Sequence, residues 1–217
     1  MKNLLICFSA ILFFACGIGN KDKSIDDLIL DEMNKKYNYA ISFFGKPMTD
    51  HFPKKIESID CSFTDSYSSE LGNLELVLLC REEKDYLNYL IKEYEKSAIA
   101  EYKASDTCLL VVNRFVNSDR HYKIYPTQNE LQLLEKDCYS NQNPIPNFWH
   151  NIFTSDSTEC KLSEDFSIYV IEAKKGKYFE EYLSDAWFMP EKWKHGYSKG
   201  VAISEENSAV IYWLIIW

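Results

Sequence analysis

The chain contains little glycine and little proline, and it has no repeated segment. Its 217 residues include seven Gly and six Pro, whereas aromatic residues make up 15%. Disordered and linker-rich chains show the opposite balance, because they lack the apolar side chains that a core requires. A chain of this length buries about 70% of the surface that it exposes when unfolded. We therefore expect one folded domain with a sizeable core.

Positive charge is also scarce. The chain has 24 Lys and Arg against 33 Asp and Glu, so its formal net charge is −9. An acidic surface repels both the phosphate backbone of nucleic acids and anionic lipid head groups. We therefore expect no nucleic-acid partner.

The sequence lacks the local motifs of common metal sites. Its four histidines, His51, His121, His150 and His195, have no second ligand at helical or hairpin spacing, so no zinc motif is present. The oxygen-rich segment 154–165 lacks the ligand order and the central glycine of an EF-hand loop. We predict no metal and no cofactor.

One short pattern matches a catalytic motif without its context. Residues 196–200, GYSKG, fit the Gly-x-Ser-x-Gly pattern of the α/β-hydrolase nucleophile elbow. That elbow requires a strand before the serine and a helix after it, with the catalytic histidine later in the chain. Here a short helix is expected before Ser198, a strand after it, and no histidine follows. We assign no catalytic residue and interpret the two glycines as a helix end and a strand start.

The longest apolar run lies near the N-terminus. Residues 4–15 form a run of twelve, which is too short to span a bilayer, since a span takes about 20 residues. Lys2 precedes this run and the small Ala15 stands directly before Cys16. The arrangement resembles the signal peptide of bacterial lipoproteins, in which the cysteine after a small residue is diacylated and becomes the first mature residue. The resemblance implies a signal peptide at residues 1–15, a lipidated tether at 16–23 and a globular domain at 24–217.

The same resemblance implies a cellular location. Acyl chains on Cys16 would hold the domain at a membrane of the cell envelope, because each buried methylene adds about 0.8 kcal/mol. Gly17 follows Cys16, whereas an Asp in that place resembles an inner-membrane retention signal of some bacteria. We therefore expect the outer membrane.

The cysteines of the predicted domain are odd in number. Setting Cys7 and Cys16 aside from the seven leaves five, namely Cys61, Cys80, Cys108, Cys138 and Cys160. No Cys-x-x-Cys occurs, so a thioredoxin-like redox site is not indicated. We predict a Cys138–Cys160 disulfide across the proline-containing loop, worth about 3 kcal/mol by the chain-entropy relation. Cys80 and Cys108 lie in apolar runs and are expected to be buried thiols.

The spacing of apolar residues predicts helices and strands in alternation. Ser24 with Asp27, and Thr127 with Glu130, are helix-start signatures. Strands are expected where apolar residues alternate or form short dense runs, and the last strand is apolar on both faces, which predicts a central position. The class is therefore α+β, a single domain with a mixed sheet packed against amphipathic helices. Helices are expected at 24–44, 83–97, 128–138, 177–183 and 190–196, and strands near 59–63, 74–80, 108–115, 122–125, 166–173, 200–204 and 209–217.

An aromatic and basic cluster near the C-terminus is the candidate ligand or partner surface. Aromatic rings stack on sugars or cations, and Trp and Tyr are favoured at interfaces. The alternative is that the two tryptophans cover the core beneath the final hairpin, because large aromatic side chains are mostly buried. The candidate residues are Trp187, Trp193, Lys194, His195 and Tyr197, with Phe188 between them.

Three functions are compatible with this sequence. The first is a noncatalytic envelope lipoprotein that binds a protein or glycan partner, which we favour because no catalytic signature is present. The second is an envelope hydrolase acting on glycan or peptidoglycan, which a pocket with His or carboxylate groups of perturbed pKa would favour. The third is an immunity or inhibitor protein with an exposed acidic face. An open apolar patch would favour partner binding.

Overall fold

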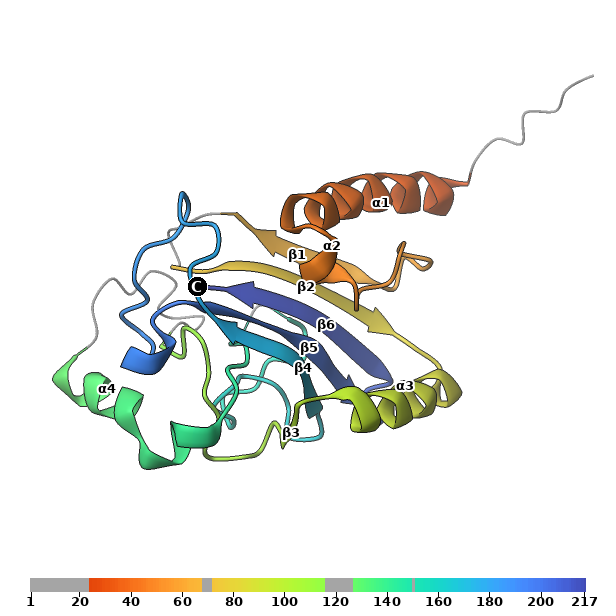
Figure 1. Ribbon diagram of the computed structural model, residues 1–217. Coiled ribbons are helices and arrows are strands. Elements are labelled where there is room, and N and C mark those ends of the chain that lie inside the picture. Colours follow the sequence, from red (N-terminus) through yellow and green to blue (C-terminus); the bar gives the residue numbers. More distant parts are fainter. Residues whose placement is uncertain (1–23, 68–71, 116–126, 150) are drawn as a thin grey trace, which may run out of the picture.

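The computed structural model describes residues 24–67, 72–115, 127–149 and 151–217 (Figure 1). The predicted strand near 122–125 lies outside these ranges. None of the described helices combines the length and the apolar character needed to cross a membrane. The helices are α1 (Ile25–Phe44), α2 (Lys46–Thr49), α3 (Lys84–Ser97) and α4 (Gln128–Gln132). The strands are β1 (Ser62–Ser66), β2 (Leu74–Arg81), β3 (Ala100–Lys103), β4 (Ser167–Lys175), β5 (Gly196–Ser204) and β6 (Ala209–Ile216).

The six strands form one sheet in the order β1-β2-β6-β5-β4-β3. Helices beside this sheet confirm the predicted α+β class. The sheet differs from the expected mixed sheet in one respect, since every pair of neighbouring strands is antiparallel. The predicted C-terminal hairpin is confirmed, because residues 205–208 join β5 directly to β6. Parallel neighbours would instead need a long crossover connection.

The sheet is covered on both sides, and β6 shows this most clearly. Val210, Tyr212, Leu214 and Ile216 pack on the side that we call the helix face, against α1 and α3. Ile211, Trp213, Ile215 and Trp217 pack on the side that we call the loop face, against chain segments within 104–166 and 186–193. Successive strand residues point to opposite faces, so a strand apolar at every position requires cover on both. The predicted central position of the last strand is confirmed.

Local signals placed the helix starts correctly. The hydroxyl of Ser24 accepts a hydrogen bond from the backbone of Asp27, and the Asp27 carboxylate accepts one in return. Thr127 and Glu130 form the same reciprocal pair at α4. Each pair satisfies backbone donors that have no partner within the helix. Gly45, at φ +80°, ends α1 in a conformation that other residues rarely adopt.

Several predicted elements are wrong. Residues 108–115 are buried but form no strand beyond a single bridge between Val111 and Ile145. Residues 177–183 are turns rather than a helix, and the predicted helix at 128–138 consists of α4 followed by short 3₁₀ turns. The short strand β3 was not expected. A dense apolar run indicates burial, but it does not separate a strand from an irregular buried segment.

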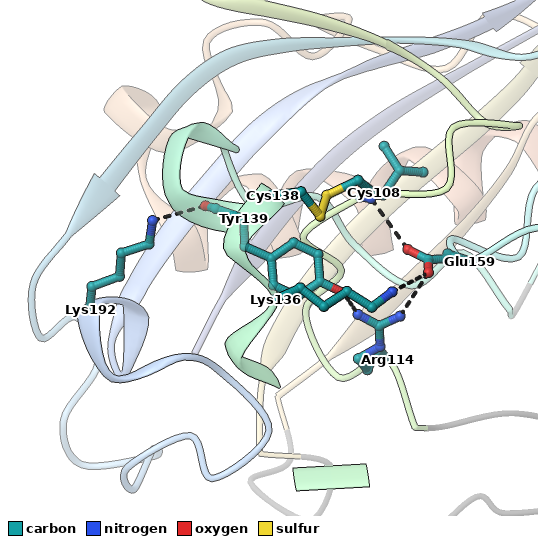
Figure 2. Close-up of a disulfide and its surroundings, with 8 residues drawn as sticks. Cys108, Arg114, Lys136, Cys138, Tyr139, Glu159 and Lys192 are labelled. Carbon is teal, nitrogen blue, oxygen red and sulfur yellow. Dashed lines mark hydrogen bonds and ion pairs between the residues drawn. A yellow bond between two sulfur atoms is a disulfide. The ribbon is translucent and has the colours of Figure 1, made fainter. Parts of the chain in front are cut away.

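The predicted disulfide is also wrong. Cys138 bonds to Cys108 (Figure 2). Cys61, directly before β1, bonds to Cys80 in β2. Cys160 is a buried free thiol, with its sulfur 3.8 Å from the carbonyl oxygen of Ala104. Cys80 and Cys108 are therefore not the expected free thiols. A bridge requires two Cα atoms within about 7 Å, a condition that spacing along the chain does not reveal.

Candidate functional site

The predicted aromatic and basic cluster does not form one surface. Trp193 is buried and packs on Trp217, with ring centroids 5.9 Å apart. Trp187 stacks on Phe115, also in the core on the loop face. Tyr197 points to the opposite side of the sheet and belongs to the helix-face core. These contacts match the alternative, in which the large aromatic side chains cover the core.

The two basic members of the cluster have acidic neighbours. Lys194 forms an exposed ion pair with Glu191 at 3.5 Å, of a kind that contributes little stability. His195 Nε2 lies 2.7 Å from Asp185 Oδ1. This pair borders an open cavity of about 460 Å³, whose lining includes Lys177, Tyr178, Glu180, Leu183 and Ser184. His195 therefore reaches a cavity.

The GYSKG segment is explained by packing. It forms the first half of β5, where the buried Ser198 hydroxyl donates to the Pro144 carbonyl at 2.6 Å. A Cβ atom at Gly200 would lie 2.2 Å from the Tyr169 carbonyl oxygen and 2.5 Å from the Trp213 ring. The glycine is thus required by close approach of a neighbouring strand and an indole. Neither the strand context nor the buried serine fits a nucleophile elbow.

A charged cluster secures the segments on the loop face (Figure 2). The Glu159 carboxylate lies 2.9 Å from Lys136 Nζ and 3.2 Å from Arg114 Nη2, and it accepts a hydrogen bond from the Leu109 backbone. Tyr139 accepts a hydrogen bond from Arg114. The Cys108–Cys138 disulfide joins the same segments. These charged groups pair with one another inside the protein, so we assign this cluster a structural role.

The described residues contain no group of three His, Cys, Asp or Glu side chains that could hold a metal ion. Within the oxygen-rich segment 154–165, Asp156 pairs with Lys161 at 3.0 Å. Asp165 accepts hydrogen bonds from Ser204 and from Asn207. The oxygens of these two carboxylates thus have partners within the protein.

An apolar groove lies between α1 and β1, at the edge of the sheet. It has a volume of about 780 Å³, and three large apolar side chains on the first half of α1 are exposed at it. Ile25 is 76% exposed, Leu28 55% and Ile29 46%. We call this surface the α1–β1 groove. It is lined by Ile25, Leu28, Ile29, Glu32, Met33, Lys36, Cys61, Ser62, Phe63 and Asp65.

The strand beside this groove has one open side. β1 ends the strand order of the described sheet and pairs only with β2 there. Figure 1 shows α1 along this edge. An edge strand presents a row of backbone N–H and C=O groups on its outer side, which can pair with another strand. The α1–β1 groove therefore lies beside a strand whose outer side has no partner strand in the described sheet.

The helix predicted at residues 24–44 did not indicate that its first turns would be exposed. The apolar stripe of α1 runs from Ile25 to Phe44, and a continuous stripe predicts one buried face. In the structure Tyr37, Ala40 and Phe44 are buried, whereas Ile25, Leu28 and Ile29 lie outside the helix-face core. The stripe alone contained no signal for this difference, because exposure depends on how far the sheet reaches beneath the helix.

No protein-family model, curated protein or solved structure matches this chain.

Proposed function

We propose that this protein is a cell-envelope lipoprotein, anchored through lipid on Cys16, whose α+β domain binds a protein partner at the α1–β1 groove. The observation that carries the proposal is the exposure of Ile25, Leu28 and Ile29 together at a groove of about 780 Å³. Contiguous exposed apolar side chains mark interaction surfaces on soluble domains.

The edge strand favours an extended segment of the partner. A peptide that adds to a sheet edge gains main-chain hydrogen bonds and places alternate side chains on each face. On β1, Phe63 and Asp65 line the groove, so alternate residues of an added strand would contact α1. We propose that these alternate residues are apolar.

Charge favours a protein over the bilayer itself. The first half of α1 carries Asp26, Asp27, Asp31 and Glu32, and the whole chain has a net charge of −9. Anionic lipid head groups attract basic segments and repel acidic ones. The partner segment is accordingly expected to carry Lys or Arg beside its apolar residues.

The proposed anchor would keep this groove near the membrane. Eight residues, 17–24, separate Cys16 from the start of α1 at Ile25. A fully extended chain spans at most about 3.5 Å per residue, so this tether reaches about 28 Å. The partner is therefore proposed to be another protein of the envelope, and the outer membrane remains our proposed address.

Site-specific crosslinking tests the groove. A photoreactive residue replaces Leu28 in one strain and Ile99 in another, since both side chains are 55% exposed and Ile99 lies outside the groove. We expect one envelope protein to be crosslinked at position 28 and absent at position 99. The Ile29→Asp variant should lose this adduct, whereas Ile99→Asp should keep it. Equal adducts at both positions, or none at position 28, would refute the partner surface.

Fractionation tests the anchor separately. Cys16→Ala should move the protein out of the membrane fraction, because the acyl chains would have no attachment point. A variant that stays in the membrane fraction would contradict the lipid anchor. It would not bear on the proposal that the α1–β1 groove binds a partner. Finding the wild-type protein only in the inner membrane would contradict the proposed outer-membrane address.

An envelope hydrolase is the second candidate function, and the His195–Asp185 pair beside an open cavity favours it. A carboxylate that holds an imidazole can support acid and base catalysis. Release of soluble fragments from purified peptidoglycan by the wild type, but not by His195→Ala, would support this function. If the protein is an inhibitor or immunity protein, it would bind its partner at the same groove. The activity of the partner would then be lost on binding.

A further inference from the structure

Another cavity lies on the helix face, between the segment that follows α2 and the start of α3. Its volume is about 660 Å³, and we call it the Tyr86 cavity. Leu78 and Tyr212 form its floor, and both belong to the helix-face core. Residues 53–58 line one side, and Glu82 and Tyr86 line the other. Ligand sites in proteins have volumes of about 300 to 1,000 Å³, so this cavity has the size of a binding site.

Exposed tyrosine rings lie at this cavity. Tyr86 is 41% exposed, and Tyr89, one turn further along α3, is 57% exposed. The two rings are stacked with centroids 6.3 Å apart, so they form one aromatic surface that continues from the cavity along the helix. Large aromatic side chains are mostly buried in folded proteins. Two neighbouring rings that stay exposed offer a flat apolar surface to a ligand.

The cavity also has polar groups, and they differ in how far the protein itself uses them. Lys55 pairs with Glu57 at 3.2 Å, and the Arg81 guanidinium donates to the Asn207 carbonyl at 3.3 Å. Among the described residues, no side chain forms a hydrogen bond or an ion pair with the Glu82 carboxylate. Burial and repulsion by Glu57 raise the pKa of Glu82. Glu82 is therefore the acceptor in this cavity that gains most from a hydrogen-bond donor on a ligand.

Charges of both signs restrict the class of ligand. An anionic ligand would meet the carboxylates of Glu57 and Glu82, and a cationic ligand would meet the ammonium groups of Lys54 and Lys55. An uncharged ligand with many hydroxyl groups avoids both repulsions, because a hydroxyl donates to a carboxylate and accepts from an ammonium group. The C–H face of a sugar ring also packs on an aromatic ring. These properties together favour an oligosaccharide.

We infer that the Tyr86 cavity binds a short, uncharged oligosaccharide. One pyranose ring stacks on Tyr86, and its hydroxyl groups donate to the Glu82 carboxylate. Tyr89, outside the cavity lining, extends the stacking surface to the next sugar. These three residues lie outside the lining of the α1–β1 groove. The inference therefore goes beyond the proposed function and does not depend on it.

Calorimetric titration of the purified full-length protein tests this inference. The probes are cellotetraose and N-acetylated chitotetraose, because equatorial substituents give their sugar rings flat C–H faces. Tetragalacturonate and tetralysine are the anionic and cationic comparisons. We expect saturable binding of at least one uncharged tetrasaccharide, and about tenfold weaker binding of both charged probes, because each meets like charges at the cavity. No binding of either tetrasaccharide, or tighter binding of a charged probe, would overturn the inference.

Two variants with matched controls make the test specific. Tyr86→Ala should weaken oligosaccharide binding about tenfold, because it removes the stacking surface. Tyr39→Ala removes another exposed tyrosine outside the cavity and should bind as the wild type does. Glu82→Gln keeps the size of the side chain and should also weaken binding about tenfold, because it removes the charged acceptor. Its control is Glu83→Gln, which changes an exposed carboxyl outside the lining and should have no effect.

The failure of this inference can be told apart from the failure of the proposed function. Ile29→Asp should lose the crosslinked adduct at the α1–β1 groove and keep oligosaccharide binding, whereas Tyr86→Ala should do the reverse. Circular dichroism checks that each variant is folded. A folded Tyr86→Ala protein that binds the oligosaccharide as tightly as the wild type would overturn the inference.

Discussion

The Lys199 ammonium lies 2.7 Å from Oδ1 of Asp50, which ties β5 to the segment directly after α2. The same Nζ atom lies 2.8 Å from the Pro47 carbonyl oxygen and 3.4 Å from Glu172 Oε2. The Lys199 side chain is 5% exposed, whereas Asp50 is 54% exposed. A charge brought into the core is thus held by partners that remain in contact with water.

Lys199→Ala should lower the free energy of unfolding by about 2 to 4 kcal/mol. The substitution removes charge-assisted hydrogen bonds, worth about 1.5 to 3 kcal/mol each, and buried methylene groups. Urea unfolding followed by circular dichroism measures the change. Lys174→Ala is the control, because Lys174 also pairs with Glu172 but is 58% exposed. Its effect should be much smaller than that of Lys199→Ala, because solvent screens an exposed ion pair, and equal effects would contradict this prediction.

Peptide mapping without reduction should recover two linked pairs, Cys61 with Cys80 and Cys108 with Cys138. Cys160 should resist alkylation in the folded protein, because it is buried and its burial raises the pKa of the thiol to about 11. It should react at once in denaturant. The thiolate is the reactive form, so a buried, protonated thiol is inert. A Cys138–Cys160 peptide would contradict the structure.

Protonation of His51 should make the free energy of unfolding depend on pH. Its Nε2 atom lies 3.0 Å from the Trp213 carbonyl oxygen, and burial lowers the pKa of the imidazole from 6.5 to about 4. Between these two values the unfolded chain binds more protons than the folded one, so stability falls as the pH falls from 6.5 to 4. The loss from this residue between pH 7 and pH 5 is about 2 kcal/mol.

The His51→Gln variant isolates this contribution. It removes the titrating ring, so its stability should decline less than that of the wild type between pH 7 and pH 5. Glu75 acts in the opposite sense, because its raised pKa lowers stability as the pH rises from 4.5 to about 7. The comparison is therefore made between wild type and variant at each pH. Parallel stability curves would show that His51 titrates normally.

Gly200→Ala should destabilise the sheet strongly. The added methyl group would overlap the Tyr169 carbonyl and the Trp213 ring, and overpacking of a core costs about 1 to 3 kcal/mol or more. Thermal unfolding measures the loss. The neighbouring Ser198→Ala removes only a hydroxyl and its hydrogen bond, so about 1 kcal/mol is expected there. A Gly200→Ala protein as stable as the wild type would contradict the close approach.

Features that depend on neighbouring residues could be predicted from the amino-acid sequence. The capping pairs of Ser24 and Thr127 act across three positions, and the two apolar faces of β6 follow from the alternation of adjacent residues. The turn between β5 and β6 is equally local. These interactions need no knowledge of the rest of the chain, so the starts of α1 and α4, the final hairpin and the α+β class were predicted correctly.

Features that depend on distant residues became evident only in the folded chain. Cys138 meets Cys108 because the segments on the loop face fold over one another. Ile25 and Leu28 are exposed although they lie on the same helix as the buried Tyr37. Trp193 and Tyr197 separate to opposite faces of the sheet. The physical reason is that apolar burial is not directional. A pattern of apolar residues therefore predicts that a side chain is buried. The packing of whole elements determines which residues it packs against.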